Sequence, residues 1–492
     1  MLFEAFTNTV GTMPSSRGIR LDGKTHPYHE LAERSERLAS GLLNFGIGVG
    51  DAVAILMRSS PDLFVLTQAL FAVGAIAVPL DVQANPSEIL RTVGQFKIRA
   101  VVASADLRSL AEQLALGAGV DLPVLVSEPA GKFGGLGDTA VGPLPSIGAD
   151  AVAAYLFSSG STGRPKVVPR THGQLLADAE ASRPALDFTP DDVLLNILPA
   201  HHAFGFVMMF THAPLSGTST LLWTPNQPLM LARGSLLQTI AAEGVTLLPG
   251  VPFLFDLLAG VTDPADLSKV RHAFSGAAAL KRATFDSFRE RFGIAIRQAL
   301  GTTETSLASY NSSPDPVATW NSVGQAVGDT RIEVLPAEES SDPEIGELLI
   351  TSSAVTKGYL NNPEANRTSF KDGGWLSGDL GRIDADGNIY ITGRKKLIVA
   401  VAGQKVDPIE VEDVLMSHPA VAEAVVIGIP DPRTGEQRLK AVVVKKSEET
   451  AEALVNYARS HLSAHKVPYL VEFIEALPRS VTGKVLRGKL LE

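Results

Sequence analysis

The feature that most constrains the fold is a regular alternation of helix-like and strand-like segments between residues 25 and 300. Two segments have the apolar spacing of helices, and short apolar runs that suit buried strands lie around them: helices over 28–44 and 63–73, strands over 52–56, 75–78 and 100–103. Further strand candidates follow at 153–157, 193–198, 221–223, 246–248 and 295–299. Because strands that alternate with helices form parallel sheets covered by those helices, the pattern predicts two α/β layers.

The pattern changes beyond residue 328, where short strands and turn residues predict a β-rich subdomain over 328–393. In the last part, Asp407-Pro408 offers a helix N-cap followed by a proline in the first turn. The expected elements there are helices over 409–417 and 451–461 and strands over 424–429 and 439–445. The predicted fold class is therefore α/β, with a large N-terminal region of two α/β layers plus a β-rich subdomain, and a small α+β C-terminal domain.

Residues 63–80 are the most membrane-like segment, at about the minimum length that spans a bilayer. Two polar side chains, a glycine and a proline interrupt it, so we expect a buried helix that ends near Gly74 and then a short interior strand, with no membrane span. The first residues have no basic region followed by an apolar core, so no secretory signal is visible. A cytoplasmic location is the expectation.

Composition excludes several kinds of chemistry. The chain has no cysteine, which excludes disulfides, thiolate nucleophiles, zinc–cysteine sites and iron–sulfur clusters. The net charge of −10 has the wrong sign for general attraction to phosphate backbones, so we expect no nucleic-acid partner.

A loop rich in glycine and hydroxyl side chains directly follows the predicted strand 153–157. It reads Ser158-Ser159-Gly160-Ser161-Thr162-Gly163-Arg164-Pro165-Lys166. Small residues let backbone N–H groups form an anion-binding nest, hydroxyl groups add donors, and Lys166 supplies a positive charge. The glycine spacing differs from that of a Walker loop, but the chemistry predicts a phosphate-binding loop.

Seven further motifs follow this loop in a fixed order: Pro199-Ala200-His201-His202-Ala203-Phe204-Gly205, Ser275-Gly276-Ala277-Ala278-Ala279-Leu280, Gly301-Thr302-Thr303-Glu304-Thr305, Gly374-Trp375-Leu376-Ser377-Gly378-Asp379-Leu380-Gly381, Gly393-Arg394-Lys395-Lys396, Gly403-Gln404-Lys405-Val406-Asp407-Pro408 and Pro478-Arg479-Ser480-Val481-Thr482-Gly483-Lys484. Together the eight motifs cover most of the chain and resemble the adenylate-forming superfamily. That superfamily contains acyl-CoA synthetases, the adenylation domains of nonribosomal peptide synthetases, and luciferases. The sequence is most similar to the AMP-binding acyl-CoA synthetase type.

The resemblance implies a two-step ligase. A small-molecule carboxylic acid and ATP, with magnesium, would give acyl-AMP and pyrophosphate, and coenzyme A would then displace AMP to give a thioester. Two other acceptors stay open, an amine that gives an amide and the thiol of a carrier protein. A more remote alternative is a non-catalytic acyl-adenylate binder, and a homodimer also stays open.

For the nucleotide, the resemblance implies a set drawn from several motifs. The phosphate loop contributes Ser158, Ser159, Gly160, Ser161, Thr162, Gly163 and Lys166, and the remaining members are Gly276, Ala277, Ala278, Leu300, Gly301, Thr302, Thr303, Asp379, Arg394 and Lys484. In this family Thr303 would donate to phosphate, Glu304 would hold magnesium, and Asp379 would accept from the ribose hydroxyl groups. The family usually has tyrosine where this chain has Leu300, so stacking on adenine worth about 1 kcal/mol is absent.

For catalysis, the resemblance implies Lys484, Thr303 and His202, with Lys484 bridging the acyl carboxylate and the α-phosphate. Lys396 matches the family hinge, about which a mobile C-terminal lid rotates between the two half-reactions. The expected division is an AMP-binding N-terminal domain at 1–393, a hinge at 394–396 and a lid at 397–492.

The acyl and acceptor sites come from other motifs. The expected acyl pocket consists of His202, Ala203, Phe204, Gly205, Gly276 and Gly301, with Phe206, Met208 and Met209 as further apolar candidates. The expected acceptor channel consists of Gly403, Gln404 and Lys405. The aromatic residues after His202 favour an apolar acyl or aryl group.

Overall fold

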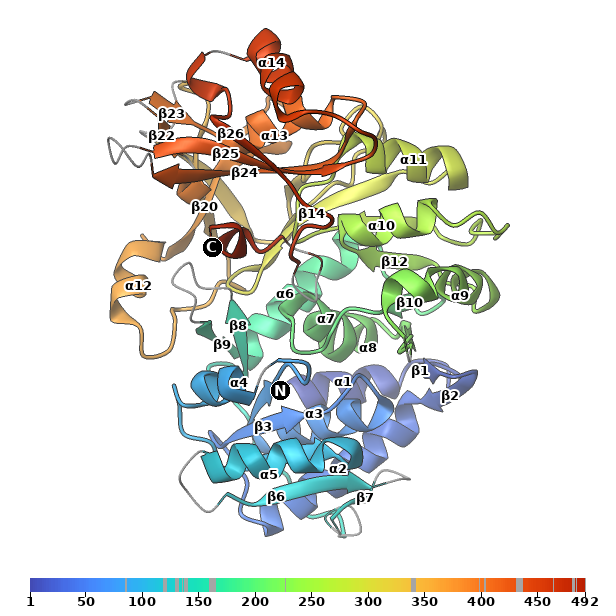
Figure 1. The fold of residues 1–492 in the computed structure, drawn as a ribbon. Coiled ribbons are helices and arrows are strands. Elements are labelled where there is room, and N and C mark those ends of the chain that lie inside the picture. Colours follow the sequence, from blue (N-terminus) through green and yellow to red (C-terminus); the bar gives the residue numbers. More distant parts are fainter. Residues whose placement is uncertain are drawn as a thin grey trace. The chain divides into compact units, whose positions relative to one another are not determined.

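The computed structural model groups the chain into two compact units (Figure 1). The N-terminal unit is Met1–Arg331 with Ile350–Trp375, and the C-terminal unit is Ile332–Leu349 with Leu376–Glu492. The structure describes all residues except 85, 118–121, 129–131, 135, 137–139, 159–164, 226, 338–341, 398, 402–403, 431–436, 463, 480–482, 484 and 492, and except the side chains of residues 132, 396, 400, 404 and 405.

One sheet of the N-terminal unit is built from the first predicted layer. Its seven strands run in the order β7(Lys132–Phe133), β6(Val124–Glu128), β5(Ala100–Ser104), β3(Ala52–Leu56), β4(Ile76–Pro79), β8(Val152–Ser158) and β9(Lys166–Thr171), with only β7 and β9 antiparallel to their neighbours. Side chains alternate across it: Val53 and Ile55 face α2(Tyr28–Asn44) and α3(Pro61–Val73), whereas Ala54 and Leu56 face α4(Pro86–Val93) and α5(Arg108–Gly117). Apolar side chains on both faces explain why the strands read as continuous apolar runs.

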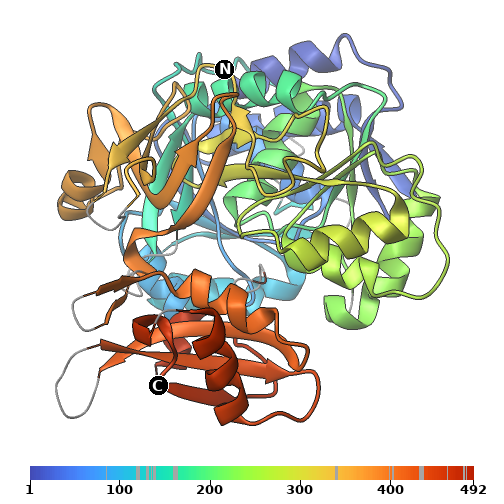
Figure 2. The ribbon, with the colours of Figure 1, turned by 90° about the horizontal axis from the view of Figure 1, so that it is seen from above.

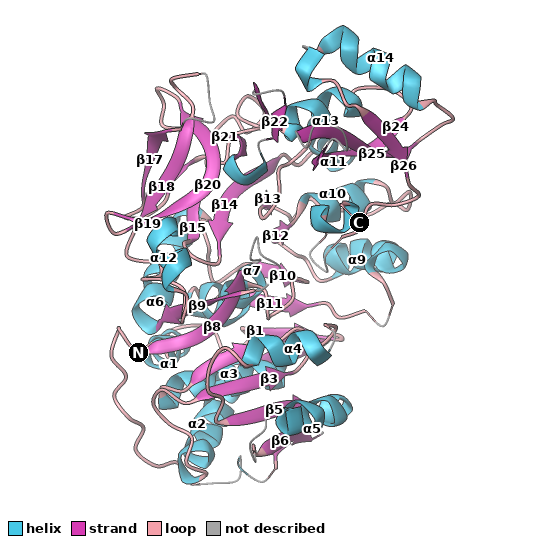
Figure 3. Cartoon of the chain, turned by 60° about the vertical axis from the view of Figure 1, so that its left-hand side comes forward, coloured by secondary structure: helices cyan, strands magenta, loops and turns pink. Residues whose placement is uncertain are grey.

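A second sheet in the same unit has nine strands. Their order is β16(Gln325–Ala326), β15(Ser306–Tyr310), β14(Ile296–Thr302), β13(His272–Ser275), β12(Leu247–Gly250), β10(Val193–Asn196), β11(Ser219–Leu222), β1(Gly18–Leu21) and β2(Lys24–Pro27), and the central strands β14 to β1 are parallel. One face packs against α9(Leu229–Ala242), α10(Pro252–Ala259) and α11(Arg282–Phe292). The other face shares a core with α1(Leu2–Val10), α6(His172–Ala185), α7(Ala203–Val207) and the π-helix η3(Met208–His212), and with α2 and α3 (Figure 3). The unit also contains η1(Ala105–Leu107), α8(Ala213–Leu215), α12(Pro363–Ser369) and β19(Phe370–Lys371).

The membrane-like segment 63–80 folds as the sequence predicts. Ser60 caps α3 by accepting a hydrogen bond from Leu63 N at 3.1 Å, and Pro61 begins its first turn. Every residue of α3 except Asp62 is buried, the helix ends at Gly74 with a φ of 71°, and buried β4 follows. Within the described part of the chain, no helix is long and apolar enough to cross a membrane.

The C-terminal unit contains most of the β-rich subdomain. β17(Arg331–Pro336), β18(Gly346–Thr351), β20(Gly374–Ile383) and β21(Ile389–Arg394) form one sheet, in which β19 pairs with the first residues of β20. A second sheet is β24(Val421–Pro430), β25(Gln437–Lys445) and β26(Leu470–Phe473), and β22(Val399–Val401) pairs with β23(Gln404–Val406). Helices α13(Pro408–Met416) and α14(Ala451–His461) pack on one face of the three-stranded sheet (Figure 2). Leu477 and Leu490 cover the other face. Single turns η4(Lys395–Leu397), η5(Ala464–Lys466) and η6(Arg487–Leu490) complete the unit.

Asp407 is the N-cap of α13, as expected, and its carboxyl group is largely buried. Its Oδ1 accepts a hydrogen bond from Ile409 N at 2.9 Å. Burial raises the pKa of the Asp407 carboxyl group to about 6; Glu412 and Glu410 raise it as well, while the Ile409 N–H and Arg487 act in the opposite direction. The folded unit therefore holds this proton more tightly than the unfolded chain does.

We expect Asp407→Asn to stabilise the C-terminal unit at about pH 7.5 by about 1–2 kcal/mol, discounted for partial exposure, and to have little effect at about pH 4. Asparagine caps a helix about as well as aspartate but carries no charge. A carboxyl group with a raised folded-state pKa contributes stability that is full below the unfolded pKa of about 4 and is lost as the pH rises through about 6. Urea unfolding of both proteins at the two pH values measures the difference, and an equal effect at both would contradict the expectation.

Candidate active site

The ends of the phosphate loop are fixed by a β-hairpin of the N-terminal unit. Ser158, the last residue of β8, pairs across the antiparallel ladder with Lys166, the first residue of β9. The Lys166 ammonium group lies 4.2 Å from the centre of the Tyr359 ring. The intervening predicted site residues, Ser159, Gly160, Ser161, Thr162 and Gly163, lie outside the described residues. The two ends of the predicted phosphate loop are therefore held together by paired strands, and Lys166 lies at one of these ends.

A second segment that the sequence predicts to bind anions, Thr302 to Glu304, lies at the end of β14. Thr303 and Glu304 are buried, with exposed fractions of 9% and 5%. Thr302 Oγ1 accepts a hydrogen bond from Thr305 N at 3.2 Å, and Ser306 has a left-handed φ of 60°. These contacts form a tight turn that presents two oxygen-bearing side chains next to each other.

A fully buried arginine holds this turn from behind. Arg170, on β9, donates to the carbonyl oxygen of Thr303 at 2.7 Å and to that of Ala354 at 2.7 Å. The Thr356 N–H donates to the carbonyl oxygen of Glu304 at 2.8 Å. Burying a guanidinium group costs several kcal/mol unless its donors are satisfied, and these charge-assisted bonds offset that cost. The strand after the phosphate loop and the Thr303–Glu304 turn are therefore connected directly.

The Glu304 carboxylate suits a magnesium ion. Its Oε1 accepts a hydrogen bond from the Tyr359 hydroxyl group at 2.9 Å. Magnesium prefers oxygen ligands and is usually bound by one or two carboxylates together with substrate phosphates, and not by a cage of protein ligands. The described residues contain no group of three or more acidic or histidine side chains placed to hold a metal ion. A single buried carboxylate beside Thr303, a predicted phosphate-binding residue, fits this pattern. Magnesium bound there would neutralise phosphate charge.

In the C-terminal unit, the predicted ribose and nucleotide residues form an ion pair. Asp379 on β20 lies opposite Arg394 on β21, and Arg394 Nε donates to Asp379 Oδ1 at 2.6 Å. The Asp379 N–H donates to Ser377 Oγ at 2.9 Å. Asp379 is buried while the Arg394 side chain is 43% exposed. The pair holds the carboxylate in one orientation, as recognition of two adjacent hydroxyl groups requires.

Two of the predicted acyl-pocket residues, Phe204 on α7 and Gly276 after β13, lie close to each other. His202 is the N-cap of α7, and its Nδ1 accepts from Phe204 N at 3.4 Å. A side chain at Gly276 would lie 3.6 Å from the Phe204 ring and 3.6 Å from the Ala299 carbonyl oxygen. Ala277 has a left-handed φ of 66°. The half-buried Phe204 ring and the glycine thus face each other next to β14.

Other residues of the same motifs serve the core. A side chain at Gly205 would lie 2.4 Å from the Pro199 carbonyl oxygen, so this position needs glycine for packing. Phe206 packs against Phe71 and Phe210, and Met208 and Met209 are buried in the same core, as is Ala203. Leu300 is also buried, and Gly301 lies on the solvent-exposed end of β14.

The neighbouring histidine has a different environment. His201 Nε2 lies 3.8 Å from Asp81 Oδ2, and burial lowers the pKa of His201 while Asp81 acts in the opposite direction. His202 is the histidine that caps α7, which distinguishes the two adjacent side chains.

The predicted catalytic lysine, the hinge lysine and the predicted acceptor channel also lie wholly or partly outside the described structure. Lys484 and Gly403 are not described at all, and the side chains of Lys396, Gln404 and Lys405 are not described. Their roles remain predictions from the sequence.

The structure also places residues in the site that the sequence reasoning did not single out. Arg170 follows Lys166 by four positions, and an arginine directly after the apolar residues Val167 to Pro169, next to a predicted phosphate loop, was the available signal. Tyr359 had no such signal, because its partner Glu304 is 55 residues away in the chain. Trp375 belongs to the motif at 374–381, but nothing in the sequence indicated a contact with Tyr359.

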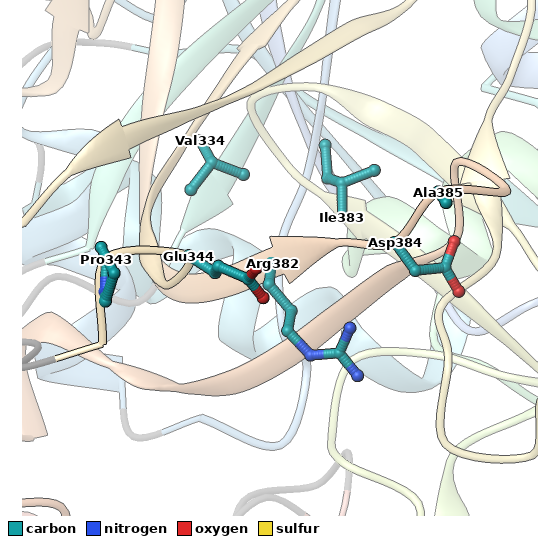
Figure 4. Close-up of a pocket in the computed structure, with 7 residues that line it drawn as sticks. All are labelled: Val334, Pro343, Glu344, Arg382, Ile383, Asp384 and Ala385. Carbon is teal, nitrogen blue, oxygen red and sulfur yellow. The ribbon is translucent and has the colours of Figure 1, made fainter.

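A separate hollow lies on the sheet of the C-terminal unit (Figure 4). Its volume is about 500 Å³ and it is lined by Val334, Pro343, Glu344, Arg382, Ile383, Asp384 and Ala385. Asp384 accepts hydrogen bonds from Asn388 and from the Tyr390 hydroxyl group, and the Arg382 guanidinium group lies 4.4 Å from the centre of the Tyr390 ring. These contacts stabilise the turn between β20 and β21, and none of them involves a predicted site residue.

Comparison with known proteins shows the class to which this fold and site belong. Residues 6–360 match the model of the AMP-binding enzyme family, and residues 410–484 match that of the AMP-binding enzyme C-terminal domain. The chain belongs to the AMP-binding enzyme family.

The chain is similar to coenzyme A ligases over nearly their full length. The chain is 31% identical to a feruloyl-CoA synthase from Amycolatopsis sp, covering 97% of this chain and 96% of that protein. It is 30% identical to a sulfoacetate–CoA ligase from Cupriavidus necator, covering 95% and 92%. ATP-bound MatB from Rhodopseudomonas palustris has a TM-score of 0.90 at 28% identity, covering 100% of this chain and 98% of that one.

These findings confirm several predictions. The α/β fold with a smaller C-terminal domain is confirmed, and so is an acyl-CoA ligase that forms an acyl-AMP and then a CoA thioester. ATP and magnesium are supported as well by a structure of o-succinylbenzoate CoA synthetase from Bacillus subtilis with ATP and magnesium, at 25% identity and a TM-score of 0.86. An amine or carrier-protein acceptor is not needed to explain the chain.

Proposed function

We propose that this ligase activates an apolar carboxylic acid whose aryl or alkyl group contacts Phe204. The observation that carries the proposal is that the half-buried Phe204 ring lies close to Gly276. The Ala299 carbonyl oxygen is equally close to Gly276, and Leu300 and Gly301 follow Ala299 on β14. Glycine at 276 places no side chain against this edge of the ring. Thr303, to which we assign phosphate binding, directly follows the last residue of β14, so in this proposal an acid that contacts the ring has its carboxylate near the phosphates.

The names of the relatives leave the acid open. They include feruloyl-CoA synthase and 4-coumarate–CoA ligase, which carry aryl groups in their names, and sulfoacetate–CoA ligase, which names a small charged acid. The half-buried Phe204 ring, whose centre lies 6.2 Å from that of the core residue Phe274, favours the first group. A small charged acid is the second candidate.

In the proposed reaction, the phosphate loop and Lys166 hold the β- and γ-phosphates while Thr303 donates to a phosphate oxygen. Magnesium, when bound at Glu304, supplies positive charge against the triphosphate. Asp379 accepts from the ribose hydroxyl groups, and Lys484 places an ammonium group between the acyl carboxylate and the α-phosphate as they react. These residues orient two anions that otherwise repel each other.

The second half-reaction requires a different set. We assign the hinge to Lys396 and the acceptor channel to Gly403, Gln404 and Lys405, with lid rotation about residues 394–396 bringing the channel to the thiol of coenzyme A. A homodimer and a cytoplasmic location also remain predictions, of which size-exclusion chromatography with light scattering tests the first.

Pyrophosphate exchange with a panel of acids tests the proposed substrate class. We expect exchange with cinnamate-like, benzoate-like and medium-chain alkanoic acids, at least about tenfold above that with sulfoacetate, malonate or amino acids, since an apolar group gains from burial against the ring. Phe204→Ala should lower kcat/KM for the preferred acid by about 10- to 100-fold because its ring contact is lost. Exchange with amino acids or sulfonated acids alone would exclude an apolar substrate.

A further inference from the structure

We propose that Tyr359 is a positioning residue for the magnesium carboxylate, and that Trp375 fixes the direction in which its hydroxyl group donates. The inference rests on the proposed role of Glu304. Tyr359, Trp375 and Glu304 all belong to the N-terminal unit and are 5%, 6% and 5% exposed. They form a short chain of hydrogen bonds: Trp375 Nε1 to Tyr359 Oη at 3.1 Å, and Tyr359 Oη to Glu304 Oε1 at 2.9 Å.

The chemistry of the three groups allows only one direction for this chain. An indole N–H can donate but cannot accept, so Trp375 must donate to the Tyr359 oxygen. A phenol has one proton, and an ionised carboxylate only accepts, so that proton must point at Glu304.

The tyrosine itself is held firmly. Its backbone N–H donates to Asn366 Oδ1 at 2.7 Å, and Asn366 Nδ2 donates back to its carbonyl oxygen at 2.9 Å. Leu360 N donates to the Val167 carbonyl oxygen at 2.9 Å, which fixes the segment to β9. The Phe370 ring meets the tyrosine ring edge-on at 5.5 Å. A donor held this firmly offers Glu304 Oε1 a hydrogen bond from one defined direction.

A carboxylate fixed in this way presents its second oxygen in a defined direction. A hydrogen bond to Oε1 limits rotation of the group, and a metal ion then meets Oε2 without having to order the side chain first. Replacing a residue that hydrogen-bonds to a metal-binding carboxylate commonly lowers metal affinity or activity by about 10- to 100-fold. The same tyrosine ring carries the Lys166 ammonium group on its face, so one residue contacts both the cation of the phosphate loop and the carboxylate for the metal.

The test is the magnesium dependence of ATP binding, which needs no turnover. In the absence of acid, isothermal titration gives the Kd for ATP in EDTA and in saturating Mg²⁺, and their ratio measures the coupling between metal and nucleotide. We expect Tyr359→Phe to lower this ratio about tenfold, through weaker binding in Mg²⁺, with the Kd in EDTA unchanged. The Mg²⁺ concentration for half-maximal pyrophosphate exchange should rise by a similar factor, with little change in kcat at saturation.

Two variants extend the test. Trp375→Phe keeps the tyrosine but removes the donor that orients it, so a smaller decrease of about two- to fivefold is expected. Tyr390→Phe is the matched control, because Tyr390 also donates to a carboxylate, Asp384 Oδ2 at 3.2 Å, in the turn between β20 and β21. It should leave both Kd values unchanged.

Glu304→Gln separates the inference from the proposed function. If Glu304→Gln lowers the ratio and Tyr359→Phe does not, Glu304 holds the metal and the role of Tyr359 is overturned. If neither changes it, the role of Glu304 fails as well. A lower melting temperature of Tyr359→Phe with an unchanged ratio would make the tyrosine a structural residue only, which would also overturn the proposal.

Discussion

Lys484→Ala is expected to slow acyl-AMP formation by about 10²- to 10³-fold while leaving thioester formation from supplied acyl-AMP nearly unchanged. In the first half-reaction, negative charge moves between the acyl carboxylate and the α-phosphate, and the lysine ammonium group stabilises that charge where it develops. In the second half-reaction the acyl-AMP already exists, so this charge is no longer formed in the same place. Single-turnover assays of each half-reaction measure the two rates separately.

A matched control lies five residues further along the chain. Lys489 is an exposed lysine on η6, and Lys489→Ala should leave both rates unchanged. Equal losses in both half-reactions on replacing Lys484 would contradict its assignment to adenylation. Equal losses for Lys484→Ala and Lys489→Ala would mean that both lysines act only through their positive charge, and that Lys484 has no specific role in adenylation.

Asp379→Ala is expected to raise the KM for ATP by about 10²- to 10⁴-fold. A carboxylate that accepts from both ribose hydroxyl groups makes two charge-assisted hydrogen bonds, each worth about 1.5–3 kcal/mol. The change also removes the partner of Arg394, which donates to Asp379 Oδ1 at 2.6 Å. ATP titrations of pyrophosphate exchange measure the effect.

Asp379→Asn refines this result because it keeps one acceptor oxygen. It should give a KM for ATP between those of the parent chain and the alanine variant. Asp386→Ala, in the exposed turn after β20, serves as the control and should leave the KM unchanged. A kcat effect for Asp379→Ala without a change in KM would argue against ribose binding.

Much of the fold could be predicted because apolar periodicity directly records burial. The predicted helix over 28–44 coincides with α2, and the predicted helix over 451–461 coincides with α14. Gly74 marks the end of α3 because its left-handed backbone conformation is one that glycine adopts without strain. Asp407-Pro408 begins α13 for equally local reasons.

Other features depend on pairings that no local pattern contains. The structure groups residues 332–349 with the C-terminal residues because β18 pairs within the sheet of β20, a contact between distant parts of the chain. The π-helix η3 carries Met208 and Met209 into the core, and an apolar run alone does not distinguish core from pocket. The partners of Glu304 and Thr303, Tyr359 and Arg170, become visible only when segments separated by 55 and 133 residues meet.

Product analysis tests the central assignment most directly. The full chain is incubated with ATP, Mg²⁺, a mixture of carboxylic acids that includes aryl and alkyl members, and coenzyme A, and the products are identified by mass. We expect AMP, pyrophosphate and the thioester of an apolar acid in equal amounts. Formation of ADP and phosphate, or of acyl-AMP that coenzyme A does not consume, would contradict an AMP-forming acyl-CoA ligase.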